Sequence, residues 1–482
     1  MAEVNRETVA SNVIWRFLER FGAQIVAFVV SIILARLLDP VVYGTVALVT
    51  VFTTIFQVFV DSGFGSALVQ KKNADELDFS TVFYFNIVVC LLLYGVMFFV
   101  APLIADFYGN SELTSIIRVL SLVLVISGFK SIQSTYVAKH LLFKKFFWAT
   151  IIGTVISAVI GIYMAFKGYG VWALIAQNLI NHFIDTIILW IIVRWKPKRM
   201  FSFDRLKTLF KFGSKLLVSA LMDVTYNQVR ALIIGKKYSS EDLAFYNRGE
   251  QIPNLAINNL NSAIDSVLLP SLSLVQDDKA RVKQMLRRSI SVSCFLLFPV
   301  MMGIAVCANS IIAVLLTEKW SPAVIYLQLF CLIYAFYPIH TANLNAMKAM
   351  GRSDYFLKLE TIKKVLGLGL LFGMMWISVE AIVWSLVIIN LVSLVINTWP
   401  NRKILGYGFF EQMKDILPAL ISSVVMGFVV YLIYLSNGAG GFTLIKQVLV
   451  GVVIYVTLAS IFNSGVVKYL LDFINKKRSK KN

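Results

Sequence analysis

The sequence is poor in the residues that build metal and redox sites. It has 4 cysteines and 3 histidines in 482 residues. The cysteines are Cys90, Cys294, Cys307 and Cys331. Because all four lie in apolar runs and none forms a C-x-x-C pair, we expect them to pack in the protein interior. His140, His182 and His340 show no metal-ligand spacing. The composition therefore predicts neither a metal site nor another cofactor.

Charged residues are also scarce, at 15% of the chain against 58% hydrophobic residues. No G-x-x-x-x-G-K motif occurs, so the sequence gives no sign of ATP hydrolysis by this chain. Apolar runs long enough to cross a bilayer recur along the whole length, and a membrane-spanning helix needs about 20 such residues. The sequence predicts an all-α integral membrane protein. The first apolar segment is too long for a cleavable signal peptide, so none is expected.

The apolar runs predict about fourteen transmembrane helices. We place them near residues 12–38, 41–68, 79–105, 112–138, 146–166, 170–194, 208–235, 242–269, 287–316, 320–347, 355–377, 379–400, 412–436 and 442–463.

The formal net charge of +19 is distributed unevenly. Basic residues gather in alternate connections, at 71–72, 139–145, 194–207, 279–288, 348–358 and 402–414. Cytoplasmic loops carry the excess of Lys and Arg, so the pattern predicts that both termini are cytoplasmic. The basic tail 465–482 is expected to form an amphipathic helix on anionic lipid. The charge thus indicates membrane topology and no nucleic-acid partner.

Three stretches of the sequence recur in the same order. "DSGFGSALVQ" from Asp61 resembles "DSVLLPSLSLVQ" from Asp265, "DPVVYG" from 39 resembles "DLAFYN" from 242, and "VWALIAQNL" from 171 resembles "VWSLVIINL" from 383. Offsets that grow along the chain indicate a duplicated unit. Six helices per unit predict two parallel-related bundles around a central cavity. The predicted parts are a six-helix bundle at 1–195, a basic cytoplasmic linker at 196–207, a six-helix bundle at 208–403, two more helices at 404–464 and the tail at 465–482.

The phrases "IILARLLDPVVYGTVAL", "DSGFGSALVQ", "LAFYNRGEQIP" and "VLLPSLSLVQDD" together resemble the polysaccharide transporter family of the multidrug/oligosaccharidyl-lipid/polysaccharide superfamily. The resemblance spans nearly the whole chain. It implies a flippase that moves an undecaprenyl-diphosphate-linked oligosaccharide across the bacterial plasma (inner) membrane by alternating access, for lipopolysaccharide or exopolysaccharide synthesis. It also implies membrane lipids, a polysaccharide polymerase and export machinery as partners.

Four acidic residues in the apolar helices need a physical reason, because a charge within a membrane is costly. Asp61 and Asp265 lie about 30–35 Å along their predicted helices, which places them at the cytoplasmic boundary. We interpret them as helix-end or gate residues. Asp185 and Asp223 fall near mid-membrane, where an ion pair and a coupling role both stay open.

Cationic side chains suit the anionic cargo that the resemblance implies, because Arg and Lys donate charge-assisted hydrogen bonds to phosphate. The candidates are Arg16, Arg20, Lys130, Arg230, Arg248 and Lys363. For each of them, snorkelling toward the interface or an ordinary ion pair stays open.

The predicted eighth helix is unusually polar. Glu250, Asn254 and Asn258 follow one another at spacing four, and Pro253 is expected to interrupt the helix. Side-chain amides donate to and accept from sugar hydroxyls, so we expect these residues to line the transport path. A polar seam against neighbouring helices is the alternative.

Two other functions stay open from the sequence. An ion-coupled efflux transporter of small organic cations predicts an acidic cavity, whereas basic residues are prominent among the deep charges. A membrane-bound sugar polymerase needs a sizeable outer loop for its catalytic groups, and the predicted outer connections are about ten residues or fewer.

Overall fold

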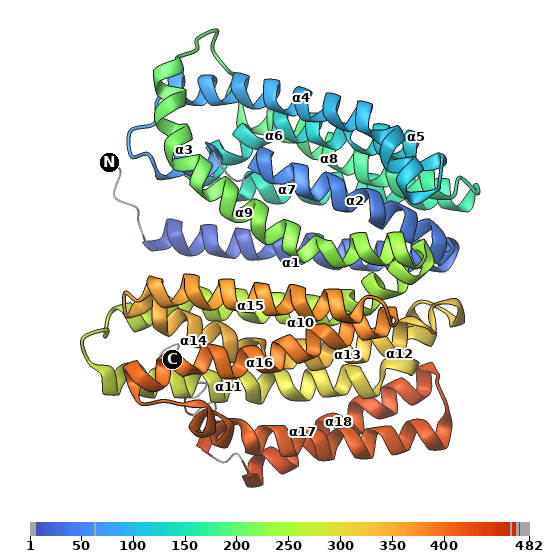
Figure 1. Ribbon diagram of the computed structural model, residues 1–482, viewed down its shortest axis with the longest axis vertical. Helices are drawn as coiled ribbons and strands as arrows, with labels where there is room; N and C mark the ends of the chain where they lie inside the picture. Colours follow the sequence, from blue (N-terminus) through green and yellow to red (C-terminus); the bar gives the residue numbers. More distant parts are fainter. Residues whose placement is uncertain (1–5, 62–63, 463–464, 469–471, 473–482) are drawn as a thin grey trace. The chain divides into compact units, whose positions relative to one another are not determined.

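The computed structural model of the protein describes residues 6–61, 64–462, 465–468 and 472. Every regular element among these residues is a helix, and no strand occurs in this part of the chain. The chain divides into two compact units, unit 1 (Met1–Ala244) and unit 2 (Phe245–Asn482). Figure 1 shows the helices of unit 1, in blue to green, running alongside one another.

Unit 1 contains nine helices among the described residues. They are α1 (Arg6–Leu37), α2 (Pro40–Asp61), α3 (Phe64–Gln70), α4 (Glu76–Tyr108), α5 (Glu112–Leu120), α6 (Leu122–Lys139), α7 (Phe143–Phe166), α8 (Val171–Val193) and α9 (Phe203–Lys237). Helix α6 packs against α2, α3, α4 and α8, while α7 packs between α1 and α8. Helix α6 is therefore the centre of this unit.

Helix α10 (Ser240–Ser273) begins at the end of unit 1 and continues into unit 2. The remaining helices are α11 (Lys279–Val306), α12 (Ala308–Leu315), the short η1 (Glu318–Trp320), α13 (Ala323–Ala335), α14 (Tyr337–Ala349), α15 (Ser353–Met374), α16 (Val379–Leu405), α17 (Phe409–Asn437) and α18 (Gly441–Phe462). Helices α17 and α18 lie side by side and pack against α11 (Figure 1).

Ten helical segments among the described residues are long and apolar enough to cross a membrane. Their apolar residues remain exposed on the outside of each unit, as in Leu92, Phe99 and Leu103 of α4, which are 64, 78 and 67% exposed. Such apolar exteriors suit lipid and would be unfavourable in water. The protein is thus a multi-pass α-helical membrane protein. Helices α1, α9, α10 and α15 lie outside this set of ten, so the predicted count of fourteen stays a prediction.

Several predicted helices begin, end or break elsewhere in the structure. The predicted helices 112–138, 287–316 and 320–347 are each divided in two, at Ser121, Cys307 and Phe336. Helix α11 starts at Lys279, ahead of the predicted start, because the Asp278 carboxylate caps it by accepting from the Arg281 amide at 3.0 Å.

The expected interruption at Pro253 is wrong. Helix α10 is continuous from Ser240 to Ser273 with Pro253 and Pro270 inside it. A proline removes one backbone donor, and the hydrogen bonds on either side hold the helix together.

Three helix ends recur in the two units in the same order. Asp75 caps the start of α4 as Asp278 caps the start of α11. Left-handed residues follow α6 and α14, at Leu141 (φ 55°) and Gly351 (φ 69°) respectively. Left-handed residues also end α8 and α16, at Arg194 (φ 61°) and Gly406 (φ 63°). The offset between the paired positions increases from the first pair to the third, as it does between the sequence echoes.

The boundary between the two units lies at Ala244, beyond the predicted linker 196–207. Helix α9, which the sequence assigned to the second bundle, packs against α2, α3 and α4 and belongs to unit 1 by its contacts. The domain limits drawn from the repeat stay a prediction, because a duplication and a contact boundary need not coincide.

Candidate functional site

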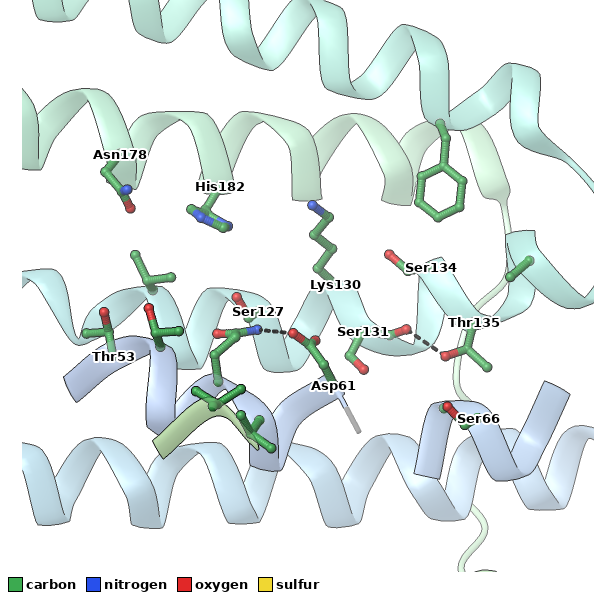
Figure 2. A pocket seen from close by; sticks show the side chains of 18 of the residues that line it. Thr53, Asp61, Ser66, Ser127, Lys130, Ser131, Ser134, Thr135, Asn178 and His182 are labelled. Carbon is green, nitrogen blue, oxygen red and sulfur yellow. Dashed lines mark hydrogen bonds between the residues drawn. The ribbon is translucent and has the colours of Figure 1, made fainter. Parts of the chain in front are cut away.

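Unit 1 has an open pocket of about 980 Å³, lined mainly by α2, α3, α6 and α8 and called the polar chamber below. Its walls carry many hydroxyl, amide and charged groups, although the helices that form it are largely apolar. Figure 2 shows side chains from α2, α6 and α8 directed into the same space.

One face of α6 supplies a polar stripe to the wall. Its members are Ser127, Lys130, Ser131, Ser134 and Thr135. Their spacing of three and four residues places them one above another on a helix of 3.6 residues per turn. Ile132 and Val137, on other faces of α6, are fully buried among apolar neighbours. The helix therefore presents a polar stripe to the pocket and apolar faces to the unit.

Helix α2 supplies a second polar stripe at the same spacing. Its members are Thr50, Thr53, Thr54, Gln57 and Asp61. The Thr50 hydroxyl donates to the Val46 carbonyl at 2.7 Å, and the Thr53 hydroxyl donates to the Thr50 carbonyl at 3.0 Å. Hydroxyls that donate to their own helix keep lone pairs free, so this wall can accept hydrogen bonds from a ligand.

An ion pair joins α6 to α8 beside the pocket. The Lys130 ammonium donates to the Asp185 carboxylate, and the two side chains are 25 and 6% exposed. Asp185 is thus buried, whereas Lys130 lies along the pocket wall and points toward α8 in Figure 2. Each charge requires the other, because an unpaired charge in this apolar environment is costly.

Asp61 supplies a second carboxylate to the pocket. The Gln57 amide nitrogen donates to Asp61 at 3.1 Å (Figure 2). Asp61 is the last residue of α2, inside the predicted helix 41–68, and its side chain is exposed to the pocket. The structure therefore brings Asp61 and Lys130 into one site, which sequence reasoning had treated as separate residues.

Three buried polar atoms at this site have no hydrogen-bond partner among the described residues: Gln57 Oε1, His182 Nδ1 and Asp185 Oδ1. Buried polar atoms are nearly always satisfied, so unpartnered ones indicate a place where water or a ligand binds. His182 and Asn178 project from α8 into the pocket (Figure 2). The site can therefore donate hydrogen bonds to polar ligand groups and accept hydrogen bonds from them.

Gly153 of α7 allows α8 to approach closely behind this ion pair. A Cβ atom at Gly153 would lie 3.2 Å from the backbone nitrogen of Asp185 and from the carbonyl oxygen of Asn181. Both neighbours are backbone atoms and cannot rotate away. The absence of a side chain at Gly153 thus fixes the position of Asp185.

Unit 2 contains the polar row predicted on α10. The Tyr334 hydroxyl donates to Glu250 at 2.5 Å, Asn254 donates to Glu250 at 3.5 Å, and Asn258 donates to Asn254. Arg248 is 7% exposed, donates to Gln251 at 2.5 Å and lies 5.3 Å from the ring centre of Trp320. These contacts are with residues of α10 itself, of η1 and of α13.

The other predicted residues make different contacts within their own units. Arg230 is 3% exposed and donates to the Tyr226 hydroxyl at 3.4 Å, while Asp223 on the same helix is exposed. Lys363 pairs with Glu360 on α15. Asp265 accepts from Asn345 of α14 at 2.6 Å.

Arg16 and Arg20 lie on α1, and their side chains are outside the described part of the structure. The predicted tail 465–482 also lies largely outside it.

Sequence reasoning missed most of the pocket wall. Gln57, Asn178 and the serines and threonines of α2 and α6 were not selected, and His182 was considered only as a metal ligand. The available signal was a polar stripe at spacings of three and four inside an apolar helix. The usual search looks for an apolar stripe on a polar helix, whereas this signal is a polar stripe on an apolar helix.

Unit 2 has a pocket of a different kind. Its volume is about 590 Å³, and α11, α17 and α18 form it. Apolar side chains such as Phe295, Val430 and Val452 dominate its walls, and Gln447 is one of the few polar residues there. The polar pocket of unit 1 is therefore the better candidate for hydrogen bonding with a hydrophilic ligand.

The fold and the pocket define a class: helical membrane proteins with a polar chamber inside an apolar bundle, as transporters have. The family model described as "Polysaccharide biosynthesis protein" matches residues 33–325. The chain belongs to this family of polysaccharide biosynthesis proteins, as the resemblance in the sequence predicted.

Two curated relatives match most of the chain. It is 26% identical to the succinoglycan biosynthesis transport protein ExoT of Rhizobium meliloti (strain 1021), over 98% of this chain and 97% of that protein. It is 21% identical to the lipopolysaccharide biosynthesis protein WzxC of Escherichia coli (strain K12), over 88% of each chain.

A solved structure has the same fold. The lipid II flippase MurJ in an inward closed conformation matches with a TM-score of 0.75 and 16% identity, over 94% of this chain and all of that one.

Proposed function

We propose that the protein is a flippase that moves an undecaprenyl-diphosphate-linked oligosaccharide across the bacterial plasma membrane by alternating access. The observation that carries this proposal is the chamber of unit 1, which presents hydroxyl, amide and charged groups inside an apolar bundle. Membership of a polysaccharide biosynthesis family, and relatives named as a biosynthesis transport protein and a flippase, support the same function. The protein is then a transporter and not an enzyme.

In this proposal the walls of the chamber have two roles. The hydroxyls of α2 and α6, with Asn178, exchange hydrogen bonds with sugar hydroxyls, which both donate and accept. Lys130, Asp61 and His182, which line the chamber, form the charge-changing part together with Asp185, the ion-pair partner of Lys130. A proton that binds to Asp185 releases Lys130 for the neighbouring Asp61, and this exchange couples proton movement to a change of conformation.

The cations and polar residues away from the chamber complete the proposed path. Arg16, Arg20, Arg230, Arg248 and Lys363 are proposed to meet the diphosphate at successive stages of transport. The polar row Glu250, Asn254 and Asn258 is proposed to form hydrogen bonds with the sugar hydroxyls along the transport path. Asp223 and Asp265 are proposed as coupling and gate residues, respectively.

The proposed topology has fourteen spans and both termini in the cytoplasm. Helices α1, α9, α10 and α15 are 32, 35, 34 and 22 residues long, enough to cross a bilayer of about 30 Å. Their lower apolar content suits surfaces turned toward a water-filled path. Cysteine accessibility at single introduced sites in both termini tests this topology.

The function is tested in proteoliposomes that contain the purified protein and a fluorescent, undecaprenyl-diphosphate-linked oligosaccharide. A reagent that acts only on the outer leaflet reports translocation, with and without an imposed membrane potential or pH gradient. We expect translocation by the wild-type protein and none by Asp185→Asn.

A second arm replaces the lipid with a fluorescent organic cation. Transport of the cation but not of the lipid would contradict the proposal and favour efflux. Equal translocation in protein-free liposomes would also contradict it.

A further inference from the structure

A second hollow in unit 1 lies at the turn between α6 and α7 and shares no lining residue with the polar chamber. Its volume is about 440 Å³. It is lined by Trp15, Leu141, Leu142, Lys144, Lys145, Trp148 and Ile192. The α6–α7 turn, the start of α7 and the last turn of α8 contribute to it, together with Trp15 of α1. Two lysines, two tryptophans and three aliphatic residues therefore surround one small cavity.

The two lysines of this hollow have no carboxylate partner in the described part of the chain. Lys144 lies 5.3 Å from the ring centre of Trp15, and neither Lys144 nor Lys145 takes part in an ion pair among the described residues. By contrast, Lys71, Lys130 and Lys283 each have an acidic partner. Two consecutive lysines without an acidic partner among the described residues make this hollow locally positive and attractive to an anion.

The tryptophans give the hollow the character of a membrane interface. Trp148 is 47% exposed, and neither Trp148 nor Trp15 donates an indole hydrogen bond to the described residues. Trp places its apolar ring in the lipid and its N–H among headgroups at such interfaces. Leu141, Leu142 and Ile192 add apolar surface to the lining of the hollow. A lining that is both cationic and apolar suits an amphiphile and not a free inorganic anion.

The backbone at Leu141 supports a specific role for this turn. Leu141 has φ 55°, a left-handed conformation that is unfavourable for a residue with a side chain. The corresponding turn of unit 2, which follows α14, has Gly351, and glycine adopts its φ of 69° without that cost. Unit 1 thus keeps a strained leucine in the hollow where glycine would relieve the strain. Strain that persists in this way indicates function.

We propose that this hollow binds the phosphate group of an anionic membrane lipid, with Lys144 and Lys145 on the phosphate and the acyl or isoprenoid chain against the aliphatic residues. The chemistry fits both a bilayer phospholipid and a polyprenyl diphosphate. The site is separate from the chamber, and the inference does not depend on the proposed cargo. Such a site would anchor the α6–α7 turn at the membrane surface.

The experiment measures lipid retention by the full-length protein in detergent, by native mass spectrometry. Three probes are added separately: phosphatidylglycerol, undecaprenyl diphosphate and zwitterionic phosphatidylcholine. The test variant is Lys144→Gln/Lys145→Gln. Its matched control is Lys207→Gln/Lys211→Gln, which removes the same charge from two exposed lysines of α9.

We expect the wild-type protein and the control to retain anionic lipid, and the test variant to bind it about 25-fold more weakly, roughly fivefold for each lysine. Weaker binding of phosphatidylglycerol identifies a phospholipid site, and weaker binding of undecaprenyl diphosphate alone identifies a site for the cargo lipid. Retention of both anionic lipids by the test variant overturns the inference. The inference is also overturned if the control variant loses as much anionic lipid as the test variant does. It is overturned as well if the wild-type protein retains phosphatidylcholine as strongly as the anionic lipids.

Size-exclusion chromatography checks that each variant remains monodisperse. Trp148→Leu provides an independent test, because it keeps the charge and much of the apolar surface but removes the indole N–H. We expect it to weaken retention about threefold. If this variant and the double lysine variant both retain as much anionic lipid as the wild-type protein, the hollow does not contribute to lipid binding.

Discussion

Lys130 and Asp185 of unit 1 occupy the same places in their helices as His340 and Asn397 of unit 2. Lys130 precedes the left-handed Leu141 by as many residues as His340 precedes Gly351. Asp185 and Asn397 likewise stand at equal separations from the left-handed residues that end α8 and α16. The contact also recurs in both units. Lys130 bonds to Asp185, and His340 Nδ1 lies 2.9 Å from the Asn397 amide.

The difference between these sites is one of charge. Asp185 Oδ1 and Asn397 Oδ1 are both buried without a partner among the described residues, so the two sites share even this detail. The first pair consists of an ammonium and a carboxylate, whereas the second consists of an imidazole and an amide. Only the first borders the polar chamber of unit 1. We therefore expect the pair in unit 1 to have a role that depends on charge and the pair in unit 2 to have none, and mutations can test this difference.

The largest effect is expected from Asp185→Ala, which leaves the Lys130 ammonium without a partner. Removal of one member of a buried ion pair costs about 3–5 kcal/mol, and the partial exposure of Lys130 places this case near the lower value. The matched change Asn397→Ala removes a neutral hydrogen bond and should cost about 1 kcal/mol. Thermal unfolding of both variants in detergent measures the difference. Equal destabilisation would remove the distinction between the units.

The second prediction transplants the neutral pair of unit 2 into unit 1. Lys130→His/Asp185→Asn should stay within about 1–2 kcal/mol of the wild-type stability, because both charges leave together. Its ability to restore polysaccharide export in a strain that lacks its own transporter should be lost, at normal abundance in the membrane. His340→Gln is the control in unit 2, and we expect it to restore export. Full export by the double variant would show that the charges have no role in transport.

The third prediction concerns the close approach of α7 and α8 behind the ion pair. Gly153→Leu should destabilise the protein by about 2 kcal/mol, because its side chain meets the backbone near Asp185. Gly95→Leu on α4 meets no atom within 4 Å at its Cβ and should be neutral or slightly stabilising. We expect Gly153→Leu to unfold at a lower temperature and to support less export than Gly95→Leu. Similar behaviour of the two would argue against tight α7–α8 contact.

The fourth prediction exchanges the left-handed residues of the two units. Gly351→Leu should cost about 1 kcal/mol, because a side chain is introduced at φ 69°. Leu141→Gly relieves the same strain but loses apolar contacts, so its net effect on stability should be within about 0.5 kcal/mol of zero. The free energies of unfolding of the two variants, measured under one condition, give the comparison. A large loss in Leu141→Gly would place the value of Leu141 in packing and not in lipid binding.

The smallest effect concerns the cap of α4, the counterpart of Asp278 in unit 2. The amide of Asp78 donates to the Asp75 carboxylate and holds the pKa of Asp75 below its ordinary value, with further help from Arg205. A lowered pKa in the folded state stabilises the protein above the unfolded pKa of about 3.8, and this stability is lost as the pH falls through the folded pKa.

Asp75→Asn should therefore be less stable than the wild type at pH 7, and equally stable once the pH is well below 3.8. The difference should not exceed about 0.5 kcal/mol, because the side chain is half exposed and solvent screens it. A pH series of thermal unfolding measures it. A difference that grows on acidification would contradict the assignment.

The apolar runs predicted the helices well, because a bilayer requires long apolar segments with internal hydrogen bonds. The breaks at Ser121 and Cys307 have no proline or glycine at the break itself, whereas the break at Phe336 has Pro338 in the first turn of α14, a signal of a helix start that sequence reasoning did not use. Pro253 gave the opposite error: it indicated a break, and the helix continues. Local signals identify helices, whereas helix breaks depend on tertiary packing.

The candidate site was predicted only in part. Lys130, Asp61 and Asp185 were found because a charge is conspicuous in an apolar helix. Their proximity was not predicted, because it depends on how α2, α6 and α8 pack. The hydroxyl residues were missed because serine and threonine are common in membrane helices and become significant only when a stripe faces a cavity.

The ion pair between α6 and α8 has a consequence for how the chain enters the membrane. Its members are 55 residues apart in the sequence, so α6 is synthesised well before α8. Until Asp185 arrives, the Lys130 charge makes insertion of α6 less favourable by about 2.5–3.5 kcal/mol. At about 5–20 residues per second, this interval is on the order of 3–10 s. During that time α6 needs protection by the insertion machinery, and we expect it to leave for the lipid only together with α7 and α8.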